Sequence, residues 1–230
     1  MSKKNQYRII SVGGSIIIPT EGFNIEFLKK FKELILARIK LGEKFILVIG
    51  GGATCRKYQQ AMKESVGASD EELDWLGIHT THLNARFVGM LFKDLAEKEL
   101  IINPTKKIKS KKSILIAGGW KPGCSTDHDA VLLAKTYGAK EIINASNISY
   151  VYTADPKKDA SAKPLPKLTW PEMKSIVGDK WNPGANLPFD PKAAKTAAKL
   201  KLKVSFIKGT DLIQFAKVLN GEGFDGTVIQ

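Results

Sequence analysis

The chain has 230 residues, of which 43 % are hydrophobic and 26 % charged, which is typical of a globular protein with a full core and excludes a disordered chain. No apolar run reaches the ~20 residues of a membrane span, and no signal-peptide-like segment follows Met1, so we expect a cytoplasmic protein with no membrane partner. The two cysteines, Cys55 and Cys124, have no CxxC spacing or histidine partner, and we expect free thiols.

The formal net charge is +13, from 36 basic and 23 acidic residues, which raises the question of nucleic-acid binding. The excess is scattered through predicted helices and is also gathered in the lysine run of residues 106–112. No aromatic residue is interleaved in that run, which favours a solvated loop over an RNA surface. A basic protein whose ligands are all polyanions needs no further partner to explain its charge, so we do not expect a nucleic-acid partner.

Strand-like runs alternate with helix-like runs from end to end. This alternation predicts an α/β fold in which a mostly parallel sheet carries helices on both faces. Strands are predicted at residues 9–12, 45–49, 114–117, 141–145, 203–207 and 226–229.

The first predicted helix covers residues 24–41, because apolar side chains recur on one face and Gly42 follows as a stop. A long, mostly helical stretch is predicted over residues 53–100. It should break near Gly67 and restart at Ser69, a capping residue followed by three acids.

The second half of the chain carries three further signals. Ser125 or Thr126 caps a helix that ends near Gly138, and the sequence Asp190-Pro191 opens an alanine-rich helix to residue 200. The segment 147–166, rich in Pro, Lys and Asp, is predicted to be a loop long enough to be functional.

Glycine-rich turns follow three of the predicted strands, at residues 13–15, 50–52 and 118–123. A strand that turns through bare backbone into a helix directs several N–H groups at one point, which suits a phosphate or carboxylate oxygen. A single such turn is equally well explained by the tight geometry that glycine allows. Three of them at three strand ends favour two phosphorylated ligands.

Motifs over nearly the whole chain resemble those of the amino acid kinase superfamily and, within it, of the uridylate kinases, particularly the archaeal type. The resemblance lies in Val12-Gly13-Gly14-Ser15, Gly50-Gly51-Gly52 with Arg56, Asp74 before Leu76-Gly77-Ile78, Asn84-Ala85, the segment from Gly118-Gly119 through Pro122-Gly123 to Thr126-Asp127, Tyr152-Thr153-Ala154-Asp155-Pro156, Asp190-Pro191 with Ala193-Ala194-Lys195, and Gly226-Thr227-Val228-Ile229.

This resemblance implies a single domain with the three-layer αβα sandwich of the amino acid kinase fold. It implies a front, acceptor-binding lobe over about residues 1–138 and a back, ATP-binding lobe over about residues 139–230. The implied reaction is transfer of the γ-phosphoryl group of ATP to UMP, giving UDP, with Mg²⁺ and without a dedicated protein metal site. It also implies a homo-oligomer, a hexamer built as a trimer of dimers that form through the first long helix.

Site residues follow from the resemblance by position. The catalytic group would comprise Lys195, Arg56, Gly14 and Ser15. The UMP site would comprise Gly51, Asp74, Trp120, Lys121, Pro122, Gly123, Cys124, Ser125 and Thr126. The ATP site would comprise Gly14, Ser15, Gly52, Arg56, Ser146, Asn147, Tyr152 and Asp155.

The chain departs from these relatives at several positions. Many of them carry a lysine where this chain has Ser11, and loss of such a donor typically costs ~10²–10³ in rate. Our candidate substitute is Lys195, with Lys192 one turn nearer the start of the same helix. Tyr150 replaces a glycine beside the ATP site and reshapes that turn. Trp120 replaces a small hydroxyl residue and either stacks on the pyrimidine or packs against a neighbouring element.

Structural roles remain open for several of these residues. Lys195 is also explained as a solvated helix lysine, Arg56 as half of a surface ion pair and Asp74 as a helix-surface acid. His79 and His82 have metal-like spacing but no third ligand within reach in the sequence, which favours a packing or capping role.

Four functions remain open at this stage. UMP kinase leads, followed by a kinase of another small acid or phosphate, such as acetylglutamate or isopentenyl phosphate. A catalytically impaired nucleotide-binding protein is the third, favoured by Ser11 and Tyr150. An RNA-binding protein is the fourth and rests on charge alone.

Overall fold

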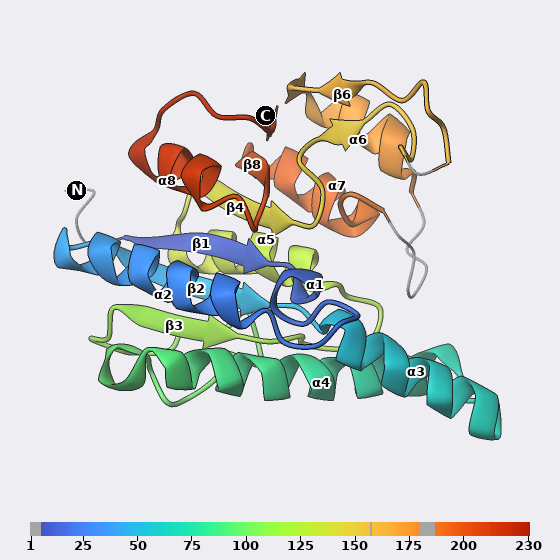
Figure 1. Cartoon of the computed structure of the whole chain (residues 1–230), viewed down its shortest axis with the longest axis horizontal. Coiled ribbons are helices and arrows are strands. Elements are labelled where there is room, and N and C mark those ends of the chain that lie inside the picture. Colours follow the sequence, from blue (N-terminus) through green and yellow to red (C-terminus); the bar gives the residue numbers. More distant parts are fainter. Residues whose placement is uncertain (1–5, 157, 180–186) are drawn as a thin grey trace.

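The computed structural model describes residues 6–156, 158–179 and 187–230. A seven-stranded sheet forms its centre, in the order β3-β2-β1-β4-β8-β9-β7, and β9 runs antiparallel to β8 while the other paired strands are parallel (Figure 1). The strands of this sheet are β1 (Tyr7–Val12), β2 (Lys44–Ile49), β3 (Ile114–Ala117), β4 (Glu141–Ser146), β7 (Lys167–Leu168), β8 (Lys203–Lys208) and β9 (Thr227–Ile229).

Helices cover both faces of the sheet (Figure 1). They are α1 (Gly14–Ile17), α2 (Ile25–Lys40), α3 (Gly52–Val66), α4 (Asp70–Leu91), α5 (Thr126–Tyr137), α6 (Trp170–Val177), α7 (Pro191–Lys199) and α8 (Leu212–Asn220), with the short 3-10 helix η2 (Lys93–Leu95) after α4. The predicted mostly parallel sheet between two helical layers is therefore confirmed.

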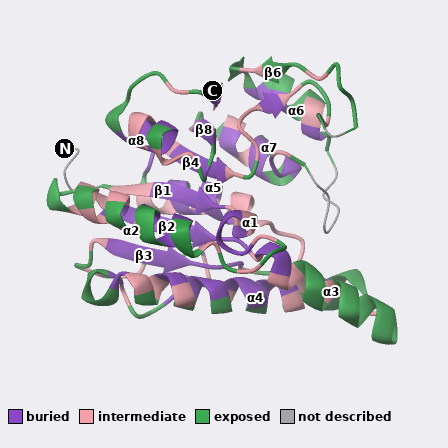
Figure 2. Cartoon of the chain, in the orientation of Figure 1, coloured by how far each residue is buried: buried purple, intermediate pink, exposed green. Residues whose placement is uncertain are grey.

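Two hydrophobic clusters, one on each face, hold the layers together (Figure 2). Neighbouring residues of β1 enter different clusters: Ile9 packs with α5, α6 and α7, whereas Ile10 packs with α1, α2, α4 and α8. Both side chains are fully buried. Central strands covered on both faces bury every apolar side chain, which explains why these strands are apolar runs without polar alternation.

Capping residues mark helix boundaries that the sequence predicted. Asn24 accepts a hydrogen bond from the Phe27 amide at the start of α2, and Ser69 forms a capping box with Glu72 at the start of α4. Gly67 terminates α3 in the left-handed conformation, with φ of 63°. The predicted break in the long helical stretch is confirmed, although regular α-helix ends at Leu91 and not near residue 100.

The back half of the chain differs from the prediction in three places. The segment 147–166, expected as a loop, contains the antiparallel pair β5 (Val151–Tyr152) and β6 (Pro164–Leu165). Helices α6 and α8, for which we predicted nothing, are eight and nine residues long and are capped by Thr169 and Asp211. Helices this short are marginal on their own, so their formation depends on packing, of α6 against α7 and of α8 against β8 and α2.

The strands β1, β2, β3, β4 and β8 are mutually parallel, so their carboxyl ends meet at one edge of the sheet, named here the carboxyl edge. Open α/β sheets bind ligands at this edge. The sheet continues from β1 of the predicted front lobe to β4 of the predicted back lobe, so both lobes share one sheet. The boundary between the lobes remains a prediction. Among the residues described, no helix is both long and apolar enough to cross a membrane.

Candidate active site

The first two glycine loops touch main chain to main chain at the carboxyl edge. The amide of Gly50 donates to the carbonyl of Val12 at 3.1 Å. A Cβ atom on Gly14 would lie 2.1 Å from the amide nitrogen of Gly52, and one on Gly52 would lie 2.6 Å from the carbonyl oxygen of Gly14. Gly52 also has a φ of 67°, which side chains disfavour. Glycine is therefore required at both positions for β1 and β2 to bring their loops together.

Asn84 of α4 fixes the second loop from behind. Its buried side-chain amide donates to the carbonyl oxygens of Gly50 and Gly51, each at 3.0 Å. A Cβ on Gly51 would lie 2.5 Å from the Cβ of Cys55 in the next turn. The loop is thus held in one conformation before any ligand arrives, which is the preorganisation that anion binding by backbone amides requires.

Arg56 connects the two loops at the surface. It lies in the first turns of α3, and its Nη1 donates to the hydroxyl of Ser15 at 3.2 Å. The guanidinium is exposed and has a planar fork that suits a phosphate. The predicted catalytic residues Gly14, Ser15 and Arg56 therefore lie beside one another.

The third glycine loop is anchored on α4. The amide of Gly119 donates to the hydroxyl of Thr81 at 2.7 Å, and the Nε2 of His82 lies 2.7 Å from the Gly119 carbonyl oxygen. Further along, Asp74 of the same helix accepts from the amide of Gly123 at 2.7 Å. Helix α4 therefore forms hydrogen bonds with the third loop at two points, Gly119 and Gly123.

Two further contacts hold that loop from its other side. The ammonium of Lys192, on α7, donates to the carbonyl of Gly123 at 2.6 Å, and Ser125 caps α5 through the His128 amide at 3.2 Å. Lys121 places its ammonium 4.2 Å from the centroid of the half-buried Trp120 ring. The remaining predicted UMP residues, Pro122, Cys124 and Thr126, belong to the same continuous segment.

Burial raises the pKa of the Cys124 thiol, with Asp129 adding to the shift. The thiol is consequently neutral at physiological pH and acts as a small loop residue, not as a thiolate nucleophile.

A polar cluster made of the buried Ser11 and Asn144 and the half-buried Asp127 lies next to the first loop. Asp127 accepts hydrogen bonds from the Ser11 hydroxyl at 3.2 Å and from the Asn144 amide at 2.9 Å. These three residues join α5 to β1 and β4. Burial raises the pKa of Asp127 to about 7, the charge of Asp190 adds to the rise, and the hydrogen bonds oppose it.

Two more carboxylates lie close by. Asp129, fully buried, accepts from the Trp120 amide at 3.2 Å through Oδ2, and Asp190 caps α7 by accepting from the Ala193 amide at 2.8 Å. Burial raises the pKa of Asp129 to about 8, and the charges of Asp190 and Asp127 add to the rise. Within the described part of the chain, Oδ1 of Asp129 and Oδ2 of Asp190 have no hydrogen-bond partner. With these raised pKa values, Asp127 and Asp129 are partly or largely protonated at neutral pH, so the cluster carries less negative charge than three ionised carboxylates would.

The predicted ATP residues of the back half follow β4. The hydroxyl of Ser146 lies 3.4 Å from Oδ1 of Asn147, and its carbonyl accepts from the Gly209 amide at 2.7 Å. Tyr152 on β5 meets Tyr150 edge to face, with ring centroids 6.3 Å apart. The carbonyl of Asp155 accepts two main-chain hydrogen bonds, from Lys158 and Asp159, in the turn that follows β5.

Of the remaining candidates, Lys195 and His79 are exposed and His82 is half-buried. Lys195 lies on the outer part of α7, where the structure gives it no hydrogen bond or ion pair among the described residues. His79 stacks on Trp75 with centroids 6.1 Å apart, while His82 contacts the third loop. No group of three potential metal ligands occurs in the ranges that the structure describes. These contacts give both histidines a packing role, as the sequence favoured.

A model of the amino acid kinase family matches residues 6–208. The chain belongs to this family. The uridylate kinase of Methanocorpusculum labreanum is 32 % identical, covering 96 % of this chain and 94 % of the relative. That of Pyrococcus abyssi is 30 % identical, covering 96 % and 98 %. The crystal structure of uridylate kinase from Archaeoglobus fulgidus aligns with a TM-score of 0.81 at 31 % identity, covering 97 % and 100 %.

Several residues of this candidate site have no clear signal in the sequence. Asn84 is predicted only as part of a motif, and neither Thr81 nor His82 is connected with the third loop. Asp127 is quoted only at the end of a motif, although its carboxylate contacts residues of two strands. Its place after Ser125 puts it in the first turn of the predicted helix, but the partners Ser11 and Asn144 come from other segments that only the fold brings together.

The raised pKa of Asp129 predicts how the stability of the protein depends on pH. Because the pKa is raised in the folded state from 3.8 to about 8, the folded protein binds more protons than the unfolded chain between these values. The free energy of unfolding should therefore fall as pH rises from about 4 to about 8. Asp129→Asn keeps an oxygen that can accept from the Trp120 amide but has no group that titrates. In this variant the decrease in the free energy of unfolding between pH 5 and pH 8 should be smaller by at least about 1.4 kcal/mol, the equivalent of one pKa unit.

Urea unfolding at pH 5 and pH 8 measures this difference. The exposed Asp70→Asn variant serves as the control and should follow the parent protein at both values. A parent-like pH dependence in Asp129→Asn would contradict the assignment of this buried charge.

Proposed function

We propose that this amino acid kinase transfers the γ-phosphoryl group of ATP to UMP and produces UDP. The observation that carries the proposal is the contact of two glycine loops, with Arg56 and Ser15 beside them, next to a third loop held by Asp74. The uridylate kinases that resemble this chain over nearly their whole length support the choice of UMP as acceptor.

The chemistry suits a site built mostly from main chain. Phosphoryl transfer passes through a loose transition state, so the protein has to align two anions and balance the charge that develops. The second pKa of a phosphate monoester is about 6, so the UMP phosphate is already ionised at neutral pH. It therefore attacks without a general base, and the backbone amides and Arg56 supply positioning and positive potential.

The acceptor is proposed to lie between α4 and the third loop. There Asp74 would accept from the ribose hydroxyls of UMP, and its present bond to the Gly123 amide, 2.7 Å long, orients the carboxylate toward that loop. The segment from Trp120 to Thr126 would enclose the base and the phosphate. Gly51 and Arg56 would contact the phosphate from the second loop.

The donor is proposed to lie toward the back half of the same edge. Ser146 and Asn147, directly after β4, would contact the adenine nucleotide together with Tyr152 and Asp155. Gly14, Ser15 and Gly52 would lie at the transferring phosphate. In this arrangement the triphosphate of ATP and the single phosphate of UMP would meet head to head across the paired loops.

Mg²⁺ is proposed to enter with ATP. This ion usually keeps several waters and is bound by one or two carboxylates together with substrate phosphates, so a cage of three protein ligands is not expected. Asp127 fits as the carboxylate at this edge, because a nearby cation would favour its ionised form and offset the burial that now raises its pKa. When bound, the ion would supply charge neutralisation to the transferring phosphate.

An acceptor screen tests the proposed reaction. With ATP and Mg²⁺, ADP release should be fastest with UMP and at least tenfold slower with CMP, acetylglutamate or isopentenyl phosphate at equal concentration. Faster turnover of another acceptor would overturn the choice of UMP. Tight binding of UMP and ATP by calorimetry, without UDP formation, would instead show an impaired nucleotide-binding protein.

Lysine variants of α7 test how the chain compensates for Ser11. Lys195→Ala should lower kcat more than tenfold if this ammonium replaces the missing donor. Lys192→Ala should mainly raise KM for UMP, because its ammonium holds the Gly123 carbonyl of the acceptor loop. Lys199→Ala, one turn beyond Lys195 and exposed, is the matched control and should leave both constants unchanged.

Arg56→Ala should raise KM for UMP by removing the bidentate donor beside Ser15. Unchanged kcat and KM in both Arg56→Ala and Lys195→Ala would show that neither side chain acts in the site.

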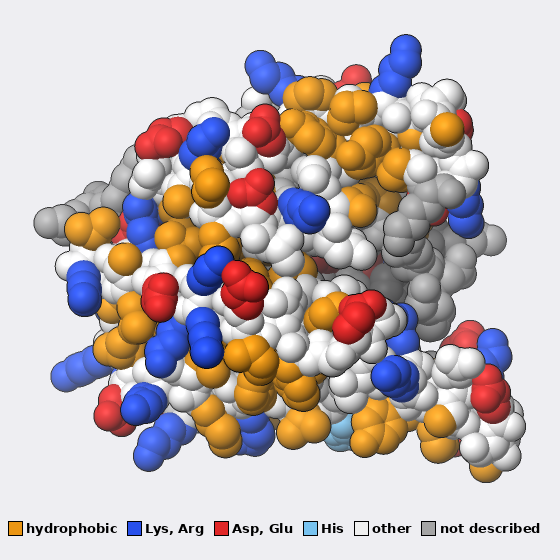
Figure 3. Space-filling model, in the orientation of Figure 1, with side chains coloured by type: hydrophobic (Ala, Val, Ile, Leu, Met, Phe, Trp, Pro, Cys, Tyr) orange, Lys and Arg blue, Asp and Glu red, His pale blue; other side chains and the backbone are white. Residues whose placement is uncertain are grey.

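A homo-oligomer, proposed as a hexamer made of dimers, is supported by the outer face of α4. The large apolar side chains Trp75, Leu83 and Met90 are 43, 63 and 75 % exposed, and hydrophobic surface follows this helix along the lower edge of Figure 3. Helix α2, which we expected to form the dimer contact, exposes mainly lysines and glutamates. We therefore place the proposed dimer contact on α4, because apolar patches of this kind mark interfaces.

The variant Leu83→Glu/Met90→Glu tests this surface. It should reduce the mass measured by light scattering, since two charges on each subunit would have to be buried in the interface. Ile213→Glu, on an equally exposed apolar residue of α8, is the control and should keep the parent mass. An unchanged mass for the α4 variant would contradict the assignment.

A further inference from the structure

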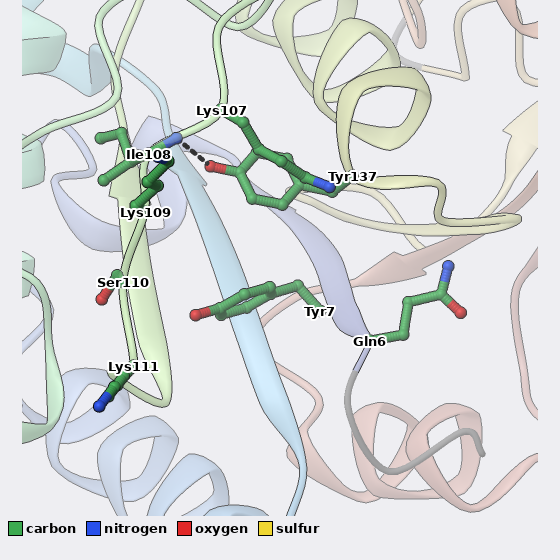
Figure 4. A pocket seen from close by; sticks show the side chains of 8 residues that line it. All are labelled: Gln6, Tyr7, Lys107, Ile108, Lys109, Ser110, Lys111 and Tyr137. Carbon is green, nitrogen blue, oxygen red and sulfur yellow. Dashed lines mark hydrogen bonds between the residues drawn. The ribbon is translucent and has the colours of Figure 1, made fainter. Parts of the chain in front are cut away.

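A groove of about 520 Å³ lies at the edge of the sheet opposite the glycine loops. It is lined by Gln6, Tyr7, Tyr137 and the segment 107–111 (Figure 4). Tyr7 is the first residue of β1, whereas the first glycine loop follows the last. The length of a whole strand therefore separates this groove, named here the tyrosine-lysine groove, from the proposed kinase site.

Three lysines line the groove on one side. Burial alternates along the segment, with Lys107, Lys109 and Lys111 exposed and Ile108 and Ser110 half-buried. Alternate residues of an extended segment are about 6.6 Å apart and point to one side. In the structure the Lys107 ammonium lies 5.4 Å from the centroid of the Tyr137 ring, and Figure 4 shows Lys111 directed away from the two tyrosines. The long stems of these exposed lysines let their ammonium groups reach phosphates at several positions along the segment.

No acidic side chain lines this groove among the described residues. Glu97, which is not part of the lining, accepts from the Ser110 hydroxyl at 2.8 Å. The charged side chains that line the groove are all lysines, which suits a ligand with several negative charges.

Two tyrosines form the other wall. Their rings meet edge to face with centroids 5.7 Å apart. Both hydroxyl groups are held by the main chain: that of Tyr7 donates to the Lys112 carbonyl at 2.7 Å, and that of Tyr137 accepts from the Ile108 amide at 3.0 Å. Figure 4 shows both phenols directed at the lysine segment. The fold thereby supplies the aromatic rings that the lysine run lacks in the sequence.

We propose that the tyrosine-lysine groove binds single-stranded RNA. One base displaces the Lys107 ammonium, now 5.4 Å from the centroid of the Tyr137 ring, and stacks on that ring, while the flanking phosphates pair with Lys107, Lys109 and Lys111. Aromatic platforms beside a basic track are the common design of sequence-tolerant single-strand binding. The net charge of +13 adds a long-range attraction.

Fluorescence anisotropy with a 5′-labelled twelve-nucleotide uridine RNA tests the proposal. Saturating UMP and ATP are present throughout, so that the proposed kinase site is occupied. The logarithm of the binding constant should fall with the logarithm of KCl concentration with a slope of about −2, the value for three phosphate contacts on a single strand. An oligomer with abasic sites at its centre should bind at least about fivefold more weakly.

Two triple variants with equal net charge separate the groove from general attraction. Lys107→Gln/Lys109→Gln/Lys111→Gln should weaken RNA binding at least tenfold and flatten the salt slope, with UMP kinase activity unchanged. The control removes three exposed lysines elsewhere, as Lys29→Gln/Lys40→Gln/Lys199→Gln, and should bind like the parent protein.

Equal weakening in both variants would overturn the proposal in favour of general charge attraction. It would also fall if the abasic oligomer bound as tightly as the parent RNA. Because kinase activity is measured on the same variants, failure of RNA binding leaves the proposed reaction unaffected.

Discussion

Direct contact between two stretches of glycine main chain is the constraint on which the carboxyl edge depends. β1 and β2 run parallel with Val12 opposite Ile49, so each strand delivers its loop to the same point. The loops meet there because Gly14 and Gly52 carry no Cβ, which would otherwise lie within 2.1–2.6 Å of the facing main chain. Every other part of the site is arranged around this contact: Asn84 holds one loop from behind, Arg56 connects both at the surface, and α4 and α7 hold the third loop beside them.

The serine at position 11 and the raised pKa of Asp127 both reflect the absence of a cation at the end of β1. A lysine at position 11 would have placed a cation where the Ser11 hydroxyl now donates to Asp127 at 3.2 Å, and a cation there would lower the pKa of the carboxyl group. With a neutral hydroxyl in its place, burial and the charge of Asp190 raise that pKa to about 7. The end of β1 therefore supplies no cation to the site of this chain. Cations from α7, or the metal that accompanies the nucleotide, are correspondingly more important to catalysis.

The sequence predicted the features that have local causes. The strand runs, the caps at Asn24 and Ser69 and the left-handed glycine that ends α3 depend on neighbouring residues, and the structure confirms them. The sequence did not predict α6 and α8, because two-turn helices are stabilised mainly by the elements on which they pack, α7 for α6 and β8 and α2 for α8. Asp127 illustrates the same limit within the site. Its helix position was evident, yet its partners Ser11 and Asn144 lie 116 and 17 residues away in the chain.

The lysine run shows why a local pattern is an incomplete guide to binding. In the sequence the run lacks aromatic residues, which favoured a solvated loop. In the fold, the main chain of the run is held by Tyr137 from 29 residues away and by Tyr7 from 105 residues away. The chain thus presents two positively charged edges of different construction. At the carboxyl edge, positive potential comes from the main-chain amides of the glycine loops, from Arg56 of α3 and from Lys121 and Lys192 beside the third loop. At the opposite edge, it comes from flexible lysine ammonium groups beside two tyrosine rings. Rigid amides select a phosphate at a fixed point, whereas mobile lysines tolerate phosphates along a strand, so the two edges suit a bound nucleotide pair and a polymer respectively.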